Sequence, residues 1–150
     1  MCGAAWRKSA VSPVLIAVWH VRSDVVAVGL AQETAARWIA ANTPERSVFV
    51  TDAFINSPVD LAGRLRISTF GPYVSNLGYD PAPREGDTTA IYCDGPEVAA
   101  ERMAKYDATY VLSSGGVPCD GDPGTDFSSS PLFETVYDTD GVTVWRLADS

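Results

Sequence analysis

Two short runs of β-branched and aromatic residues constrain this chain more than any other feature of its sequence. They are SVFVTDA, residues 47–53, and ATYVLSS, residues 108–114, and both have the composition of buried strands. Each follows a segment that favours a helix, AQETAARWIAAN at residues 31–42 and the segment that begins with GPE at residues 95–97. The repeated order of helix and strand predicts an α/β layer with parallel pairing.

A short capped helix and a third strand are predicted between these two units. SPVD, residues 57–60, offers a hydroxyl cap, a proline for the first helical position and a carboxylate for the first turn. Gly63 ends this helix, and LRIST, residues 65–69, alternates like a strand. Residues 71–78 form a second short segment, and PAPREGD, residues 81–87, has the composition of a turn-rich connector.

The C-terminal part predicts a long loop followed by a hairpin. Residues 115–131 are rich in Gly, Pro, Asp and Ser, and FETVYDTDGVTVWRL, residues 133–147, places Asp140 and Gly141 between two strand-like runs. A chain of 150 residues has the length of one domain. We therefore predict a single three-layer α/β domain over residues 33–150, with a mixed, mostly parallel sheet closed by a C-terminal β-hairpin.

Residues 1–32 are predicted to be an apolar N-terminal segment, either a linker or a membrane-proximal remnant. The apolar run at residues 13–19 is followed by His20, Arg22 and Asp24, so it lacks the about 20 apolar residues of a spanning helix. It reads either as a strand or helix packed on the domain or as the tail of a membrane anchor.

Charge and composition exclude several classes of function. The formal net charge is -8 and the pI is near 4.4, with the basic residues scattered, which disfavours nucleic acid and anionic lipid as partners. Neither central strand is followed by a glycine fingerprint for nucleotides, so we expect no cofactor. The single histidine, His20, makes a catalytic triad or a zinc site a poor expectation.

The cysteines and the acidic loop leave alternatives open. Cys93 and Cys119 pair as a disulfide in one reading and are free thiols in the other, and their wide spacing and the odd total favour free thiols. Asp120, Asp122 and Asp126 have spacings that could hold a calcium ion if the loop folded around it, but the distal glutamate and the glycine placement of a calcium loop are missing. We therefore expect a solvated acidic loop and no metal.

One region combines side chains that suit the binding of an anion. Asp52 and Asn56 follow the first central strand, and Arg64 comes directly after Gly63 with a planar group suited to a carboxylate or phosphate. Open α/β sheets bind ligands beyond the carboxyl ends of their strands. Arg64 is therefore predicted either to hold an anionic ligand there or to form an ion pair with Asp52 that fixes the loop.

Several motifs, in a fixed order along residues 33–147, resemble those of a known protein family. These are ETAARWIAANTPERSVFVTD, NSPVDLAGR, FGPYVSNLGYDP followed by REGD, AAERMAKYDATYVLSS and FETVYDTDGVTVWRL. Together they resemble the soluble C-terminal domain of multi-spanning glycosyltransferase-like membrane proteins of the GT-C type. A membrane helix would be expected before Glu33 in that family, and residues 1–30 depart from this pattern.

The resemblance implies an accessory α/β domain on the extracytoplasmic face of the membrane. Its partner would be a membrane-embedded glycosyltransferase region that uses polyprenyl-phosphate sugars, and the catalytic acid would lie in that region. The candidate residues for substrate or interdomain contact are then Asp52, Asn56, Arg64, Tyr73 and Asn76. The alternatives are a free-standing α/β enzyme that uses Asp52 as acid or base with Arg64 holding an anion, and a module for small-ligand or protein interaction.

Overall fold

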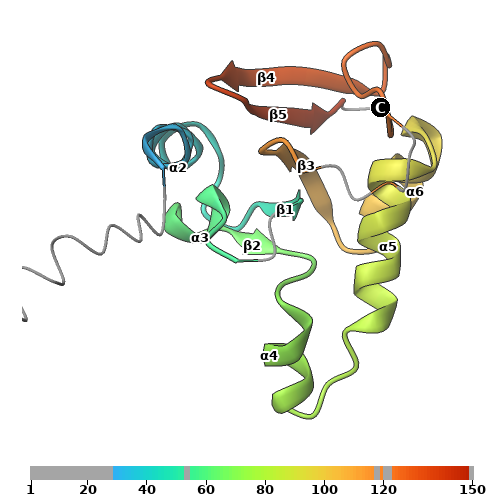
Figure 1. Cartoon of the computed structure of the whole chain (residues 1–150). Coiled ribbons are helices and arrows are strands. Elements are labelled where there is room, and N and C mark those ends of the chain that lie inside the picture. The colour runs from blue at the N-terminus through green and yellow to red at the C-terminus, as the bar shows by residue number, and fades with distance from the viewer. Residues whose placement is uncertain (1–28, 53–54, 117–118, 120–122, 149–150) are drawn as a thin grey trace, which may run out of the picture.

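A computed structural model describes residues 29–52, 55–116, 119 and 123–148 of the chain. One five-stranded sheet organises this part, with the strand order β2-β1-β3-β5-β4 (Figure 1). The strands are β1 (Val48–Thr51), β2 (Leu65–Arg66), β3 (Ala108–Ser113), β4 (Phe133–Thr139) and β5 (Val142–Leu147). Strands β2, β1 and β3 pair in parallel, and β5 joins β3 and β4 in antiparallel register.

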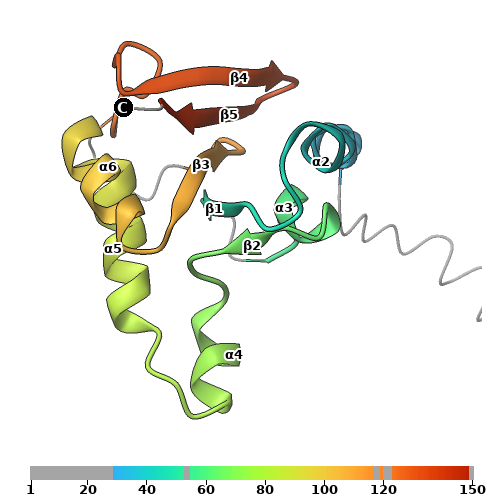
Figure 2. The same ribbon diagram turned by 180° about the vertical axis from the view of Figure 1, so that it is seen from behind.

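Helices cover both faces of this sheet, and one further helix projects away from it (Figure 1). The helices are α2 (Leu30–Asn42), α3 (Pro58–Leu61), α4 (Gly71–Asn76), which projects, α5 (Ala82–Cys93) and α6 (Pro96–Ala104). Helices α2 and α3 lie on one side of the strands and α5 and α6 on the other, and the view from behind shows the same arrangement (Figure 2). None of the described helices is long and apolar enough to cross a membrane.

The core has two halves, one on each face of the sheet, because successive side chains of a strand point to opposite faces. Phe49 of β1 packs with Ile39 of α2 and Val59 of α3 on one face. Val50, the next residue of β1, packs with Ile91 of α5 and other side chains on the opposite face. These three layers confirm the predicted α/β class with a mixed sheet and a C-terminal hairpin.

The residues predicted to cap the short helix and to form the hairpin turn adopt the predicted structure. The Ser57 hydroxyl accepts a hydrogen bond from the Val59 N–H at 3.3 Å, and the Asp60 carboxylate accepts one from the Ser57 N–H at 3.3 Å, so both ends of a capping box are made. Asp140 and Gly141 have φ values of 53° and 78°, the left-handed geometry that a two-residue hairpin turn requires.

The predicted connector at residues 81–87 is wrong, because this stretch lies almost entirely within helix α5. Its prolines fall in and just before the first helical turn, where a missing N–H costs nothing, and the Asp80 carboxylate accepts a hydrogen bond from the Ala82 N–H at 3.0 Å. The predicted strand at residues 65–69 is also shorter than expected, since β2 ends at Arg66. Residues 1–28 of the predicted N-terminal segment lie outside the described residues.

The favoured reading of Cys93 and Cys119 as free thiols is also wrong, because the two residues form a disulfide with a Cα–Cα distance of 5.6 Å. Helix α5 extends to Cys93 and thereby reaches the loop that follows β3. Thr125 of that loop holds it against the end of α5, since its N–H donates to the Tyr92 carbonyl at 2.6 Å and its hydroxyl to the Ile91 carbonyl at 3.0 Å.

Candidate functional site

The carboxyl ends of the three parallel strands meet at one edge of the sheet. Asp52 follows β1, Arg66 ends β2, and Ser113 ends β3 with Ser114 directly after it. Ligands of open α/β sheets bind at such an edge. We therefore describe the side chains at this edge first.

The Asp52 carboxylate is fully engaged with the end of β3. Its Oδ2 accepts hydrogen bonds from the Ser114 N–H at 2.6 Å, the Gly116 N–H at 3.1 Å and the Ser113 hydroxyl at 3.0 Å. Its Oδ1 accepts one from the Ser114 hydroxyl at 3.0 Å. Four donors from one segment occupy the carboxylate, so Asp52 fastens β3 to β1 and has little capacity left for a ligand.

A buried tyrosine near Asp52 stays protonated. The Tyr92 hydroxyl donates to the Leu112 carbonyl at 2.5 Å, and Tyr92 is 2% exposed. Burial raises the pKa of Tyr92 well above its usual value near 10, and the negative charge of Asp52 raises it further. Tyr92 is therefore a structural hydrogen-bond donor and does not ionise near neutral pH.

Arg64 lies at the other end of the strands from Asp52. Leu65 of β2 pairs with Val48, the first residue of β1, whereas Asp52 follows the last residue of β1. Because β1 and β2 run in parallel, Arg64 stands at their amino ends. The predicted placement of Arg64 at the carboxyl edge, and with it the Arg64–Asp52 ion pair, is therefore wrong.

The Arg64 guanidinium caps the C-terminus of α2 instead. Its Nη2 donates to the carbonyls of Ala40 and Thr43 at 2.9 and 2.8 Å, and its Nε donates to the Thr43 hydroxyl at 3.1 Å. Its Nη1 donates to the Ala62 carbonyl at 3.0 Å. A cation that satisfies the last carbonyls of a helix stabilises that helix, so these contacts give Arg64 a structural role.

The other predicted site residues are exposed and do not gather around Asp52. Asn56 has a φ of 58° just before the Ser57 cap, and Tyr73 and Asn76 lie on α4. The Tyr73 side chain is 60% exposed. Within the part of the chain that the structure describes, no hydrogen bond or ion pair joins these three residues to Asp52.

Arg66 is the arginine that the fold delivers to the carboxyl edge. Its Nε forms an ion pair with Asp60 at 3.0 Å, and its guanidinium donates to the Thr69 hydroxyl at 2.7 Å and the Thr51 hydroxyl at 3.3 Å. Its side chain is only 7% exposed. Burial lowers the pKa of Arg66 and Asp60 opposes this, but an arginine keeps its charge at neutral pH.

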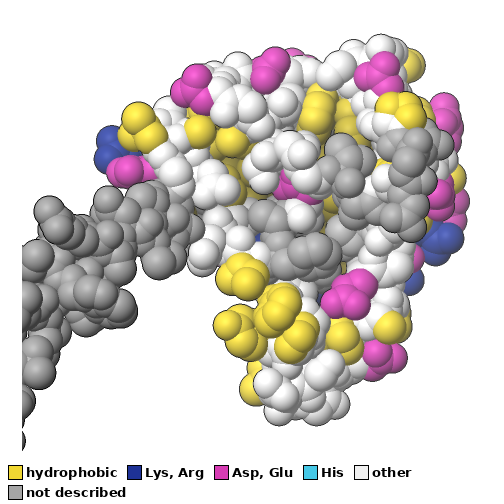
Figure 3. All heavy atoms as spheres, in the orientation of Figure 1, with side chains coloured by type: hydrophobic (Ala, Val, Ile, Leu, Met, Phe, Trp, Pro, Cys, Tyr) yellow, Lys and Arg dark blue, Asp and Glu magenta, His cyan; other side chains and the backbone are white. Residues whose placement is uncertain are grey.

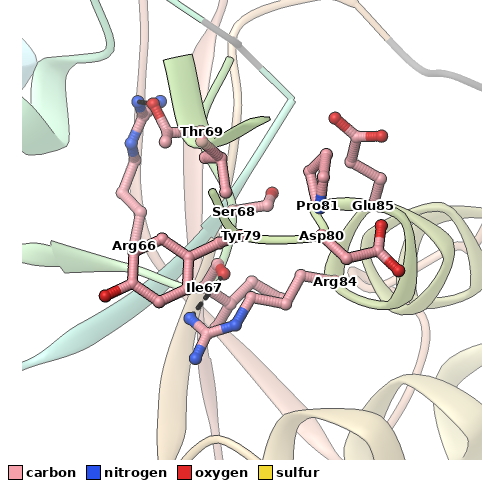
Figure 4. A pocket seen from close by; sticks show the side chains of 10 residues that line it. Arg66, Ile67, Ser68, Thr69, Tyr79, Asp80, Pro81, Arg84 and Glu85 are labelled. Atoms are coloured by element: carbon pink, nitrogen blue, oxygen red, sulfur yellow. Dashed lines mark hydrogen bonds between the residues drawn. The ribbon is translucent and has the colours of Figure 1, made fainter. Parts of the chain in front are cut away.

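A cavity of about 320 Å³ opens beside Arg66 (Figure 4). It lies among the end of β2, the segment that contains α4, and the first turn of α5. Its wall combines polar and charged side chains with an exposed aromatic ring, and includes Arg66, Ser68, Tyr79, Asp80, Arg84 and Glu85. Such a mixture suits a small polar ligand.

Sequence reasoning missed Arg84 and Glu85 because it placed them in a connector. In the structure they lie in the first turn of α5 and face the cavity. The signal was present, since prolines at the start of a helix followed by a glutamate in the first turn are typical of a helix N-terminus. Arg66 was missed for another reason, because residues 65–69 were predicted only as a short strand and no role was assigned to the charge within it.

An exposed apolar surface borders this cavity. Tyr73 and Leu77, at α4, are 60% and 76% exposed, and Tyr79, which follows, is 70% exposed. We call these three side chains the α4 surface. Hydrophobic side chains gather at this end of the molecule, over the segment labelled α4 in Figure 1 (Figure 3). Tyr79 belongs both to this surface and to the cavity wall.

Elsewhere, a cluster of charges joins α5 to the end of α6. The Asp87 carboxylate accepts hydrogen bonds from Lys105 at 2.7 Å, from Arg102 at 3.3 Å and from the Tyr106 hydroxyl. The Lys105 hydrogen bond, followed by that of Tyr106, lowers the pKa of Asp87 below its usual value near 3.8. This cluster packs two helices together and lies outside the cavity wall.

The described residues contain no group of three metal-ligating side chains. Asp126 closes a turn in which its carboxylate accepts from the Ser129 N–H at 3.1 Å and the Ser129 hydroxyl at 2.6 Å. Asp120 and Asp122, the other two residues of the calcium hypothesis, lie outside the described residues.

Comparison of the whole chain with models of known protein families gives no match, and no curated protein matches it. The geometry of the carboxyl edge, the cavity and the α4 surface therefore has to support any functional proposal, together with the motifs of the sequence.

Proposed function

We propose that this chain is a soluble accessory domain of a membrane glycosyltransferase-like protein and that it does not itself carry the catalytic acid. Its partner is a membrane-embedded glycosyltransferase region of the GT-C type, which uses polyprenyl-phosphate sugars. The observation that carries the proposal is the α4 surface, where Tyr73, Leu77 and Tyr79 are 60%, 76% and 70% exposed. It lies within the segment that the sequence motifs assign to substrate or interdomain contact.

The α4 surface has the character of an unfilled contact. Burying a large apolar side chain contributes about 1.5–3 kcal/mol, so three such side chains left in water represent a sizeable binding free energy. Contiguous exposed apolar surface marks interaction sites, and aromatic residues are enriched at the centres of interfaces. Tyrosine also suits a boundary between water and an apolar phase, because its ring is apolar and its hydroxyl is polar.

The Cys93–Cys119 disulfide supports the proposed location of the domain on the extracytoplasmic face of the membrane. Disulfides form and persist mainly in oxidising compartments and are rare in the cytosol. An extracytoplasmic domain attached to a membrane enzyme folds in such a compartment.

The non-catalytic part of the proposal is supported by the two acidic groups at the carboxyl edge. Asp52 accepts four hydrogen bonds from the β3 end, and burial keeps Tyr92 protonated. The alternative of a free-standing enzyme requires Arg64 beside Asp52, and Arg64 instead caps α2.

Site-specific photocrosslinking in membranes of the source organism tests the proposal. A photoreactive amino acid at position 73 or 77 should crosslink the chain to a multi-spanning membrane protein. The matched control is position 135, an exposed residue of β4 at the far side of the sheet from α4 (Figure 1). Crosslinks from positions 73 and 77 to soluble proteins alone, or the same products from position 135, would contradict the proposal.

A further inference from the structure

The charges around the cavity are separated in space. In Figure 4 the guanidinium groups of Arg66 and Arg84 lie on one side, toward β2, and the carboxylates of Asp80 and Glu85 lie on the other, at the start of α5. Two positive and two negative side chains line the same cavity, and an ion pair with Asp60 offsets the charge of Arg66. The wall is therefore dipolar, with Arg84 as its main positive group.

Arg84 has donors to offer on the positive side. Its Nη1 donates to the Ile67 carbonyl at 3.0 Å, and its guanidinium carbon lies 5.3 Å from the centre of the Tyr106 ring, so these two contacts hold the guanidinium beside the end of β2. Its Nε and Nη2 make no hydrogen bond with any described residue. Arg66 is already tied to Asp60 and Thr69, so Arg84 is the arginine that offers a ligand charged hydrogen bonds.

Glu85 has an unpaired carboxylate on the negative side. The side chain is half-buried, and no donor or cation among the described residues contacts its carboxylate. Its Oε1 packs over Gly71, where a Cβ added to the glycine would lie 2.2 Å from it, so the absence of a side chain at Gly71 leaves room for the carboxylate. Asp80, next to it in the cavity wall, uses one oxygen to accept from the Ala82 N–H.

This arrangement selects against ligands with only one sign of charge. An anion attracted to Arg84 would meet the carboxylates of Asp80 and Glu85 within the same cavity, and a simple cation would leave the guanidinium of Arg84 without a counterpart. A neutral polyol would leave these charges without counterparts. A ligand that carries an anionic group at one end and an ammonium group at the other satisfies both sides.

We propose that the cavity binds a zwitterionic group of the phosphoethanolamine type. Its anionic oxygens accept hydrogen bonds from Arg84, and its primary ammonium donates to Glu85 and Asp80. A cavity of about 320 Å³ has room for a group of this size. The inference rests on the cavity alone and does not depend on the attachment of this domain to a glycosyltransferase.

Two sources could supply this group, a free metabolite or the headgroup of a zwitterionic lipid. Tyr79 lines the cavity and also belongs to the α4 surface, so an acyl chain attached to a bound headgroup would leave along Tyr73 and Leu77. A short-chain phosphatidylethanolamine below its micelle concentration separates the two sources. If it binds more tightly than free phosphoethanolamine, the source is a lipid, and equal affinity assigns a free metabolite.

Titration by NMR, with amide and side-chain resonances of the whole chain as the readout, tests the proposal. Phosphoethanolamine should bind saturably and shift the resonances of residues 79–85. Ethanolamine and inorganic phosphate, which each carry one half of the zwitterion, should bind at least about tenfold more weakly. Phosphocholine, whose quaternary ammonium donates no hydrogen bond, should also bind more weakly.

Two substitutions test the assignment of each end of the ligand. Glu85→Gln and Arg84→Gln should each weaken phosphoethanolamine binding about tenfold, because each removes a charged hydrogen-bond partner while keeping a similar shape. Glu33→Gln and Arg37→Gln, which break an exposed ion pair on α2, are the matched controls and should leave binding unchanged. Should Arg84→Gln alter the fold, Glu85→Gln carries the test.

The proposal is overturned if phosphoethanolamine produces no saturable shift up to about 10 mM, well above the range of weak specific binding. It is also overturned if glucose or inorganic phosphate binds as tightly as phosphoethanolamine, or if Glu85→Gln binds like the unmodified chain. A failure of crosslinking at positions 73 and 77 would leave this inference intact, since that experiment addresses only the proposed function.

Discussion

Replacing Arg64 by alanine separates a structural role of this residue from a role in binding. The substitution removes the hydrogen bonds that its guanidinium donates to Ala40, Thr43 and Ala62, and it leaves the last carbonyls of α2 without their cation. Hydrogen bonds from a charged donor contribute about 1.5–3 kcal/mol each when buried. Because part of this site is open to water, which can replace some of these bonds, we expect Arg64→Ala to lower the free energy of unfolding by about 2–3 kcal/mol in total.

Urea denaturation followed by far-UV circular dichroism measures this loss. With an m value of about 2 kcal/mol/M, the midpoint should fall by about 1–1.5 M, without a change in m. Arg37→Ala is the matched control, since Arg37 lies on the same helix and forms only an exposed ion pair with Glu33 at 2.6 Å. Such a pair contributes about 0.3–0.5 kcal/mol, so this variant should barely shift the midpoint.

The binding measurement completes this prediction. Arg64→Ala should bind phosphoethanolamine as the unmodified chain does, because Arg64 stands at the amino ends of the strands, away from the cavity wall. If Arg64→Ala is as stable as Arg37→Ala, the capping role is wrong. If it stays stable and loses ligand binding, the placement of the site is wrong as well.

Three further predictions concern stability. Replacing Cys93 and Cys119 together by serine should lower the free energy of unfolding by about 3 kcal/mol, because the disulfide closes a loop with a sequence separation of 26. A reducing agent should no longer change the unfolding midpoint of this variant. A variant with the same midpoint as the unmodified chain would contradict this prediction. The pKa of Asp87 is lowered in the folded state, mainly by the hydrogen bond from Lys105, so its contribution is fully present above its unfolded pKa near 3.8 and is lost as pH falls through the folded value. Asp87→Asn should therefore flatten the stability profile at pH values below about 5, and a profile parallel to that of the unmodified chain would refute the assignment. Phe127→Ala, in the loop before β4, should cost about 3–4 kcal/mol, because Phe127 is 3% exposed within the core; a loss below about 1 kcal/mol would show that this loop is not part of the core.

The parts of the fold that sequence predicts are those with local physical causes. The two central strands follow from β-branched runs, α3 from the Ser57 cap and its proline, and the hairpin from Asp140-Gly141. The first turn of α5 was misread because prolines and a glycine were taken as breakers, although a proline at the start of a helix loses no hydrogen bond. Because residues 81–87 were predicted to be a connector, Arg84 and Glu85 were not considered as site residues.

The candidate site depends on facts that no local signal carries. Arg64 comes just before β2, and Asp52 comes just after β1. Because β2 pairs with β1 in parallel, the two residues lie at opposite ends of the strands and do not meet. The Cys93–Cys119 pairing depends on the length of α5, which brings Cys93 to the loop after β3. Both are matters of tertiary placement, and spacing along the chain does not encode them.

The two arginines that flank Leu65 hold β2 at its two ends, and of the two it is Arg66 that lies in the cavity wall. Arg64 ties the amino end of β2 to α2, and Arg66 ties its carboxyl end to α3 and β1 through Asp60 and Thr51. A two-residue strand at the edge of a sheet has few ladder hydrogen bonds, so these side chains hold it at both ends. Breaking the pair between Arg66 and Asp60 would leave a largely buried charge without its partner, which costs far more than an exposed pair contributes. Arg66 therefore fixes the carboxyl end of β2, which lines the cavity, and the groups free to engage a ligand are Asp80 and the side chains on the first turn of α5.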